Sequence, residues 1–74
     1  MTPAQSRAAR GLVSMTQTEL AKAASLGQST VIDFEKERRV VSDAATASIR
    51  IALEDAGVEF IAENGGGAGV RLKK

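Results

Sequence analysis

Five side chains fall on one side of the segment Gln28–Lys36 if that segment is helical, and their chemistry is mixed. The set holds an amide, a hydroxyl, an aliphatic group, a carboxylate and an ammonium group: Gln28, Ser29, Ile32, Asp33 and Lys36. Such a face can recognise a partner through hydrogen bonds and apolar contacts. It can equally be an ordinary solvated helix surface, and the residue types alone leave both interpretations open.

The inventory of reactive side chains excludes the common catalytic and metal sites. The chain has 74 residues and contains neither histidine nor cysteine. Zinc sites, histidine general bases and Ser–His or Cys–His nucleophile pairs are therefore excluded. The glycine run 65–67 is not followed by Gly-Lys-Ser/Thr, so it predicts a turn and not a phosphate loop. We expect no enzyme, no cofactor, no metal and no small-molecule ligand.

Length and hydropathy predict one small domain away from the membrane. No apolar run approaches the roughly 20 residues that span a bilayer, and the N-terminus lacks the apolar core of a signal peptide. The lack of cysteine is typical of a reducing compartment, so we expect a cytoplasmic protein. A domain of this size is only marginally stable alone, which favours a homodimer.

The charges are unevenly distributed along the chain although the net charge is only +1. Residues 1–42 hold six basic and four acidic side chains, residues 43–64 hold one basic and five acidic, and the last ten residues hold three basic. A basic front and an acidic middle suit a molecule with one anion-facing side, but they also suit a merely solvated surface.

Capping residues divide residues 1–57 into four predicted helices. Thr2 with Gln5, and Thr16 with Glu19, make two capping boxes. The third helix begins at Gln28 after a turn over 25–27, in which Gly27 is a weak N-cap. Ser42 caps the fourth helix, and Gly57 is placed to end it.

After Gly57 the apolar pattern changes to a period of two. The segments 58–61 and 70–73 alternate, and the glycine-rich segment 64–69 between them predicts a turn. They form either a hairpin within one chain or strands that pair with a second chain. We therefore expect a mainly α fold: a compact bundle of four short helices over 1–57, with a C-terminal β-element over 58–74.

Two short helices joined by a three-residue turn follow the helix-turn-helix plan. The segment 7–39, RAARGLVSMTQTELAKAASLGQSTVIDFEKERR, resembles the lambda-repressor/Cro-like, or Xre-type, helix-turn-helix regulators. The shared parts are RAAR, TQTELA, STV followed by FE, and the basic residues after them; the resemblance extends from residue 4 to about residue 57. It implies that the third helix enters the major groove of double-stranded DNA.

The resemblance assigns base reading to the mixed helix face. Gln28 matches the main reading position, where a glutamine can bond bidentately to adenine for roughly 1–3 kcal/mol of discrimination. Ser29 and Asp33 match further reading positions, and Ile32 can meet a thymine methyl. For Asp33 two roles stay open: accepting a hydrogen bond from cytosine, or repelling phosphate at wrong sites.

Other positions match backbone contacts, which give salt-dependent affinity without sequence choice. Gln17 matches a phosphate-binding position at the start of the second helix, and Thr16, Thr18, Lys36, Arg38 and Arg39 are further candidates. Thr16 also serves as a cap, and Arg39 is equally compatible with simple solvation. Arg10 and Glu35 match a pair that bridges the first and third helices and orients the reading helix.

Two positions depart from the family pattern, which commonly has glycine where this chain has Ser25 and Glu37. Ser25 must then accept the backbone of the turn, which can be left-handed. Glu37 adds a negative charge where DNA is expected.

The resemblance implies a transcriptional regulator, more commonly a repressor, that binds a pseudo-palindromic operator as a dimer. Helix four and the terminal strands are the expected dimer contacts, with these candidate residues: Val58, Phe60, Val70 and Leu72. The alternative is a module that sequesters a protein partner, as an antitoxin or anti-activator does. The acidic residues Asp33, Glu35 and Glu37 near the presumed DNA face are consistent with that alternative.

Overall fold

All four predicted helix starts are confirmed in the computed structural model, which describes residues 1–62 and 65–73. Helix α1 spans Pro3–Val13, α2 spans Gln17–Ala24, α3 spans Gln28–Glu35 and α4 spans Asp43–Asp55. Both capping boxes are complete. In each, the threonine side chain accepts from the backbone NH of the third helical residue, and the side chain of that Gln or Glu accepts from the backbone NH of the threonine. These caps satisfy backbone donors that have no partner inside the helix.

Left-handed residues end the helices where the chain must turn. Ser14 after α1 and Ser25 after α2 have φ of 55° and 56°, and Glu37, just after α3, also has φ of 56°. Gly57, at φ of 109°, follows Ala56, the C-cap of α4, and ends the helix as predicted. Ser25 and Glu37, the two positions where the family commonly has glycine, therefore both have the left-handed backbone that glycine adopts without strain.

One apolar core joins the helices to the C-terminal strands. Leu20, Val31, Ile49, Leu53 and Val58 are completely buried in it, and small alanines fill the spaces between helices. Short side chains let helices approach closely, and this is why alanines suit the inner faces of α2 and α4. Phe34 also lies in this core, three residues after Val31 and therefore on the same side of its helix.

The C-terminal strands pair within one chain. Strands β1 (Val58–Ile61) and β2 (Gly69–Leu72) form an antiparallel two-stranded sheet, in the register Val58 to Leu72 and Phe60 to Val70. The second strand begins one residue earlier than predicted. Of the predicted turn over 64–69, position 64 lies outside the described residues. The expected fold class, four helices with a short C-terminal β-element, is confirmed.

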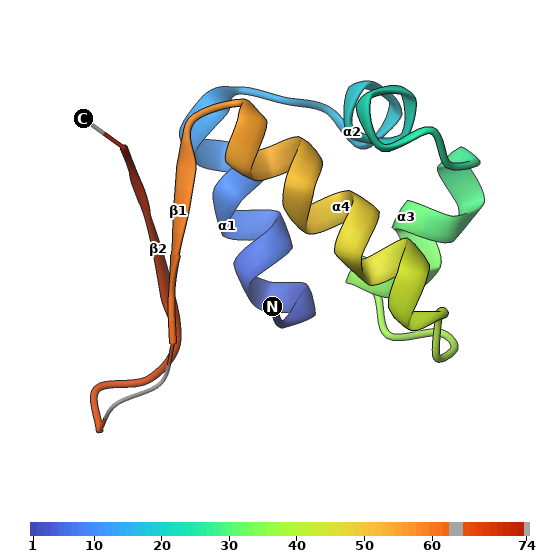
Figure 1. Cartoon of the computed structure of the whole chain (residues 1–74). Coiled ribbons are helices and arrows are strands. Elements are labelled where there is room, and N and C mark those ends of the chain that lie inside the picture. Colours follow the sequence, from blue (N-terminus) through green and yellow to red (C-terminus); the bar gives the residue numbers. More distant parts are fainter. Residues whose placement is uncertain (63–64, 74) are drawn as a thin grey trace.

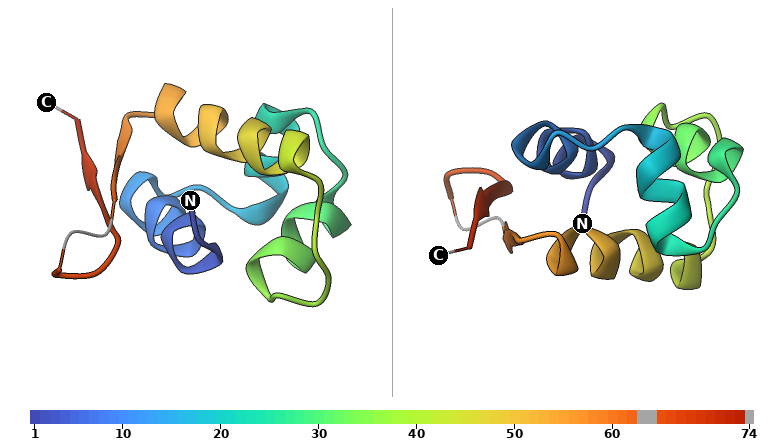
Figure 2. Two further views of the ribbon diagram at one scale, coloured as in Figure 1. Left: turned by 60° about the horizontal axis from the view of Figure 1, so that its bottom comes forward. Right: turned by 90° about the horizontal axis from the view of Figure 1, so that it is seen from above.

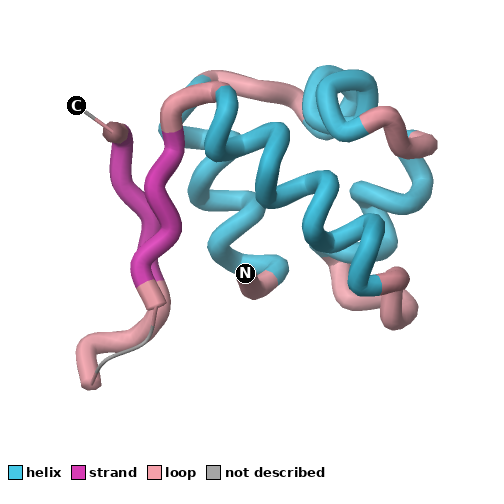
Figure 3. Tube along the Cα trace, viewed as in Figure 1, coloured by secondary structure: helices cyan, strands magenta, loops and turns pink. Residues whose placement is uncertain are grey.

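The elements are arranged along a molecule of 31 × 23 × 18 Å. Helix α4 crosses in front of α1, and the hairpin lies beside α1 (Figure 1). Both views of Figure 2 place the hairpin at one end of the molecule and the α2–α3 unit at the other. Figure 3 shows the same separation of the strands from the helices. The expected β-element is thus an extension of the helical core, far from the turn between α2 and α3.

A buried glutamine of α1 fastens the hairpin to the helices. The Gln5 amide nitrogen donates to the carbonyl oxygens of Ile61 and Gly69, at 3.2 and 2.9 Å. Its amide oxygen accepts from the backbone NH of Thr2 in the capping box. One side chain therefore caps α1 and binds both strands where they face each other in the register.

Candidate nucleic-acid interface

The turn between α2 and α3 sets the angle of the candidate reading helix. Ser25 adopts the left-handed conformation, and its NH and that of Leu26 donate to carbonyls of the last turn of α2. Gly27 then takes an extended backbone and caps α3 without a side chain. The chain turns between the two helices over three residues, 25–27, as in the helix-turn-helix plan.

Helix α3 has a fixed inner face and an open outer face. Val31 and Phe34 bury its inner side. On the outer side Gln28 and Ser29 are exposed, and Ile32 and Asp33 are half-buried. The expected reading residues thus share the accessible side of α3, and the two nearest its N-terminus are the most exposed.

Glu35, at the end of α3, is completely buried and binds side chains from both preceding helices. Arg10 of α1 holds it with two atoms: Nη2 lies 2.7 Å from Oε1, and Nε lies 2.9 Å from Oε2. Ser6 donates to Oε2 at 2.5 Å, and the Gln17 amide donates to Oε1 at 3.2 Å. This network, Ser6, Arg10, Gln17 and Glu35, joins α1, α2 and α3 at one point.

Hydrogen bonds keep the buried carboxyl of Glu35 ionised. Burial raises the pKa of Glu35, but donation from Arg10, Ser6 and Gln17 and the charge of Arg10 outweigh it, so the net pKa is lowered from 4.5. Arg7 adds a hydrogen bond to the main-chain oxygen of the same residue. Every buried side-chain polar atom among the described residues has a partner. A fully satisfied network of this kind specifies one orientation of α3.

The residues expected at the phosphate backbone differ in whether their side chains already bind other residues of the chain. Gln17 is half-buried and donates to Glu35, so its amide is already engaged in positioning α3. The Thr16 hydroxyl accepts from the Glu19 backbone NH as a cap, at 3.0 Å, whereas Thr18 is exposed. Lys36 and Arg38 are exposed, and within residues 1–62 and 65–73 neither has an ion-pair partner.

Two of the expected DNA-contacting residues bind each other. Nε of Arg39 donates to Oδ2 of Asp33 at 2.8 Å. The Arg39 side chain is 51% exposed and the Asp33 side chain 23% exposed. The carboxylate of Asp33 therefore meets a cation within its own chain.

Sequence reasoning missed Ser6, Arg7 and Gln5 as residues that fix the structure around α3 and the hairpin. Ser6 lies four residues before Arg10, so both face the same way on α1. That spacing, next to an arginine already assigned to Glu35, is the signal that identifies Ser6. Gln5 was recognised only as a cap, because its bonds reach residues 56 and 64 positions away.

Among the expected dimerisation residues, only Leu72 is broadly exposed, at 51%. Phe60 and Val70 are partly buried and pack against the core. Val58 has 0% exposure, so its side chain offers no surface to a second chain. Its burial removes Val58 from the candidate dimer contacts and makes it a core residue of its own chain.

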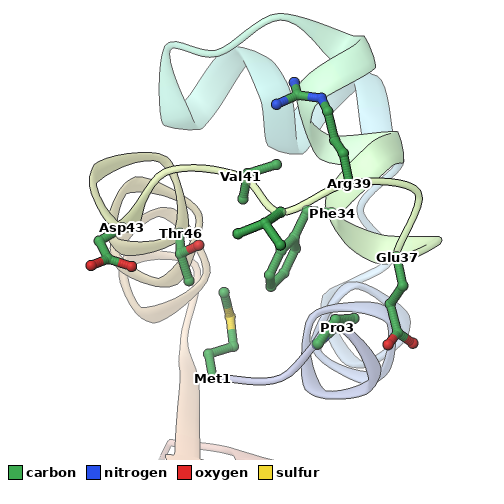
Figure 4. A pocket seen from close by; sticks show the side chains of 9 residues that line it. Met1, Pro3, Phe34, Glu37, Arg39, Val41, Asp43 and Thr46 are labelled. Atoms are coloured by element: carbon green, nitrogen blue, oxygen red, sulfur yellow. The ribbon is translucent and has the colours of Figure 1, made fainter.

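A cavity of about 480 Å³ lies between the start of α1, the end of α3 and the start of α4. Figure 4 shows the Met1 side chain pointing into its middle towards Phe34, while Glu37 and Asp43 point outwards. The lining is mixed: the apolar residues are Met1, Pro3, Phe34, Val40 and Val41, and the polar ones are Glu37, Arg39, Asp43 and Thr46. Within the described part of the chain, no group of three or more acidic side chains is placed to hold a metal ion.

No helix of the described residues is long and apolar enough to cross a membrane. Comparison of the chain with models of protein families, and with curated proteins, finds no match.

Proposed function

We propose that this protein is a cytoplasmic transcriptional regulator that binds double-stranded DNA sequence-specifically, with α3 in the major groove. The observation that carries the proposal is the two-sided construction of α3. Its inner side is held by Val31, Phe34 and the buried Glu35 network, while Gln28 and Ser29 at its N-terminal end are exposed. A rigid helix with hydrogen-bonding side chains at its exposed N-terminal end suits base recognition in the wide groove.

In this proposal the outer side chains of α3 divide between base edges and phosphates. The Gln28 amide donates to and accepts from adenine, Ser29 bonds a neighbouring base, and Ile32 contacts a thymine methyl. Exposed Lys36 and Arg38 meet phosphates on the flank, and Thr16 and Thr18 meet phosphates at the start of α2. Gln17 acts mainly through Glu35, because its amide is engaged there.

Regulation follows from occupancy of a promoter, so repression is the simplest outcome. A homodimer on a pseudo-palindromic site is the expected arrangement, with Leu72 as the most exposed of the candidate contact residues.

The second candidate function is sequestration of a protein partner. Exposed Glu37, just after α3, favours it because a carboxylate near phosphate weakens DNA binding. Asp33 favours it less, since its charge is matched by Arg39.

Selection of duplexes from a random pool tests the proposal. The wild type should recover a defined motif, with an affinity that falls steeply as salt concentration rises. Gln28→Ala and Ser29→Ala should each weaken or relax selection at one position, with unchanged circular dichroism and thermal midpoint. Ser48→Ala in α4 is the matched control and should select as the wild type does. Recovery of no motif, together with a copurifying protein, would favour sequestration instead.

A further inference from the structure

The Asp33–Arg39 pair extends the outer face of α3 beyond Ser29. Asp33 lies four residues after Ser29, so the two side chains are neighbours on the same side of the helix. Arg39 comes from the connector after α3 and reaches back to the carboxylate, with Nε 2.8 Å from Oδ2. Arg39 is also one of the residues that line the cavity of Met1 and Phe34, and in Figure 4 the end of its side chain extends away from those two residues. The guanidinium is thus held beside α3 and half exposed to solvent.

The bond to Asp33 uses one donor of Arg39 and leaves a pair of donors free. The guanidinium has five N–H groups in a rigid plane, and only the one on Nε donates to Asp33. The two Nη groups have no hydrogen-bond partner among residues 1–62 and 65–73. That free edge has the spacing of the two acceptors that guanine presents in the major groove, O6 and N7.

We infer that Arg39 reads a guanine in the major groove and that Asp33 is the positioning residue that orients it. The inference rests on the proposed function, because it places one further reading residue on the same helix face. The guanine lies roughly one to two base pairs from the base that Ser29 contacts, since one helical turn is about 5.4 Å and one base step about 3.4 Å. Asp33 itself then contacts no base.

Two simpler roles for the pair make different predictions. If Arg39 binds only phosphate, Arg39→Ala weakens binding to every sequence by the same factor. If Asp33 only repels phosphate, Asp33→Asn strengthens binding to every sequence, because a negative charge is removed. If Asp33 orients Arg39 toward a guanine, Asp33→Asn should instead weaken binding to the preferred site, because the guanidinium loses its fixed direction.

The direct test modifies the DNA and leaves the protein intact. In the motif selected by the wild type, each guanine in turn is replaced by 7-deazaguanine, which keeps base pairing but lacks the N7 acceptor. One replacement should weaken wild-type binding by roughly 5- to 150-fold. The same replacement should have little effect on Arg39→Ala, whose own loss on the unmodified site should be of similar size. Asp33→Asn should discriminate less than the wild type between guanine and 7-deazaguanine at that position. It should also bind the unmodified site more weakly than the wild type.

Matched variants separate base reading from charge. Arg38→Ala removes the neighbouring cation and should weaken all sequences alike, with every base preference retained. Glu37→Gln removes one acidic charge without touching the pair, and should strengthen binding to all sequences. If the wild type selects a motif but Arg39→Ala keeps full guanine discrimination, the inference is wrong and the proposed function stands. If the wild type selects no motif at all, both are wrong.

Discussion

Arg10 and Glu35 form a paired contact between the first and third helices, with Nη2 of Arg10 2.7 Å from Oε1 of Glu35. The Glu35 side chain is completely buried and the Arg10 side chain is 20% exposed. Arg10 also donates to the carbonyl oxygen of Met15 in the loop before α2. The same guanidinium thus binds the end of α3 and the loop that leads into α2, so the orientation of the whole helix-turn-helix depends on it.

Removal of Arg10 should destabilise the fold and impair DNA binding together. Arg10→Ala leaves a buried carboxylate without its cation, which costs about 3–5 kcal/mol of the free energy of unfolding. Urea denaturation followed by circular dichroism measures this loss. The exposed pair of Arg71 and Glu59 supplies the control, and Arg71→Ala should unfold close to the wild type. Wild-type stability and wild-type DNA affinity in Arg10→Ala would contradict the role of the pair.

The stability of the protein should fall in acid partly through Glu35. Its pKa in the folded state is lowered from 4.5 because hydrogen bonds and the charge of Arg10 outweigh burial. A carboxyl with a lowered folded-state pKa contributes stability that is fully present above its unfolded pKa, and this stability is lost as pH falls through the folded value. Urea midpoints measured from pH 6 down to pH 3 should therefore decrease.

Glu35→Gln isolates this contribution, since the amide cannot titrate. The variant should be less stable than the wild type at pH 6, and the difference should shrink as pH falls below 4.5. The dependence of stability on pH that remains in Glu35→Gln comes from other carboxyls with lowered pKa values. These are Glu19, through hydrogen bonds from Thr16, and Glu59, through its hydrogen bond from Arg71. A constant difference between the two proteins from pH 6 to pH 3 would show that the pKa of Glu35 is not lowered in the folded state.

Gln5 should control the attachment of the hairpin. Gln5→Ala removes the donors to the Ile61 and Gly69 carbonyls and should cost about 1–3 kcal/mol in stability. Amide hydrogen exchange in β1 and β2 should accelerate more than exchange in α4. Gln28→Ala is the matched control, because this exposed glutamine should change DNA selection and leave exchange unaltered. Equal exchange rates in the strands of Gln5→Ala and the wild type would contradict this role.

The left-handed residues should be sites where glycine stabilises the chain. Ser25 and Glu37 both have φ of 56°, and a side chain is strained there. Ser25→Gly and Glu37→Gly should each raise the free energy of unfolding by up to about 1 kcal/mol, after the added flexibility of the unfolded chain is counted. Ser48→Gly within α4 should lower it by about 0.5–1 kcal/mol. Destabilisation by both Ser25→Gly and Glu37→Gly would contradict the strain assigned to these positions.

Local signals explain why the helix starts and the C-terminal strands could be predicted from the sequence. A cap such as Thr16 and its partner Glu19 are three residues apart, so the pattern that forms the helix end is visible in the sequence itself. Long-range polar contacts carry no such pattern. The bonds from Gln5 to the strands and the bond from Gln17 to Glu35 depend on how the finished elements pack. The Asp33–Arg39 pair likewise depends on the path of the connector after α3.

Exposed Leu72 should matter for association if the hairpin is the dimer contact. Leu72→Asp places a charge on a side chain that is 51% exposed, so the fold should be retained while a dimer becomes a monomer. Sedimentation equilibrium measures the association, and Val40→Asp is the control because Val40 is 96% exposed in the connector before α4. Deletion of residues 58–74 is a poorer test, since it removes Val58 from the core.

The hairpin and α3 lie at opposite ends of the molecule, so a dimer joined at Leu72 should also select half-sites with a wide separation. An unchanged dimer in Leu72→Asp, or a wild type that stays monomeric on its selected DNA, would exclude this contact.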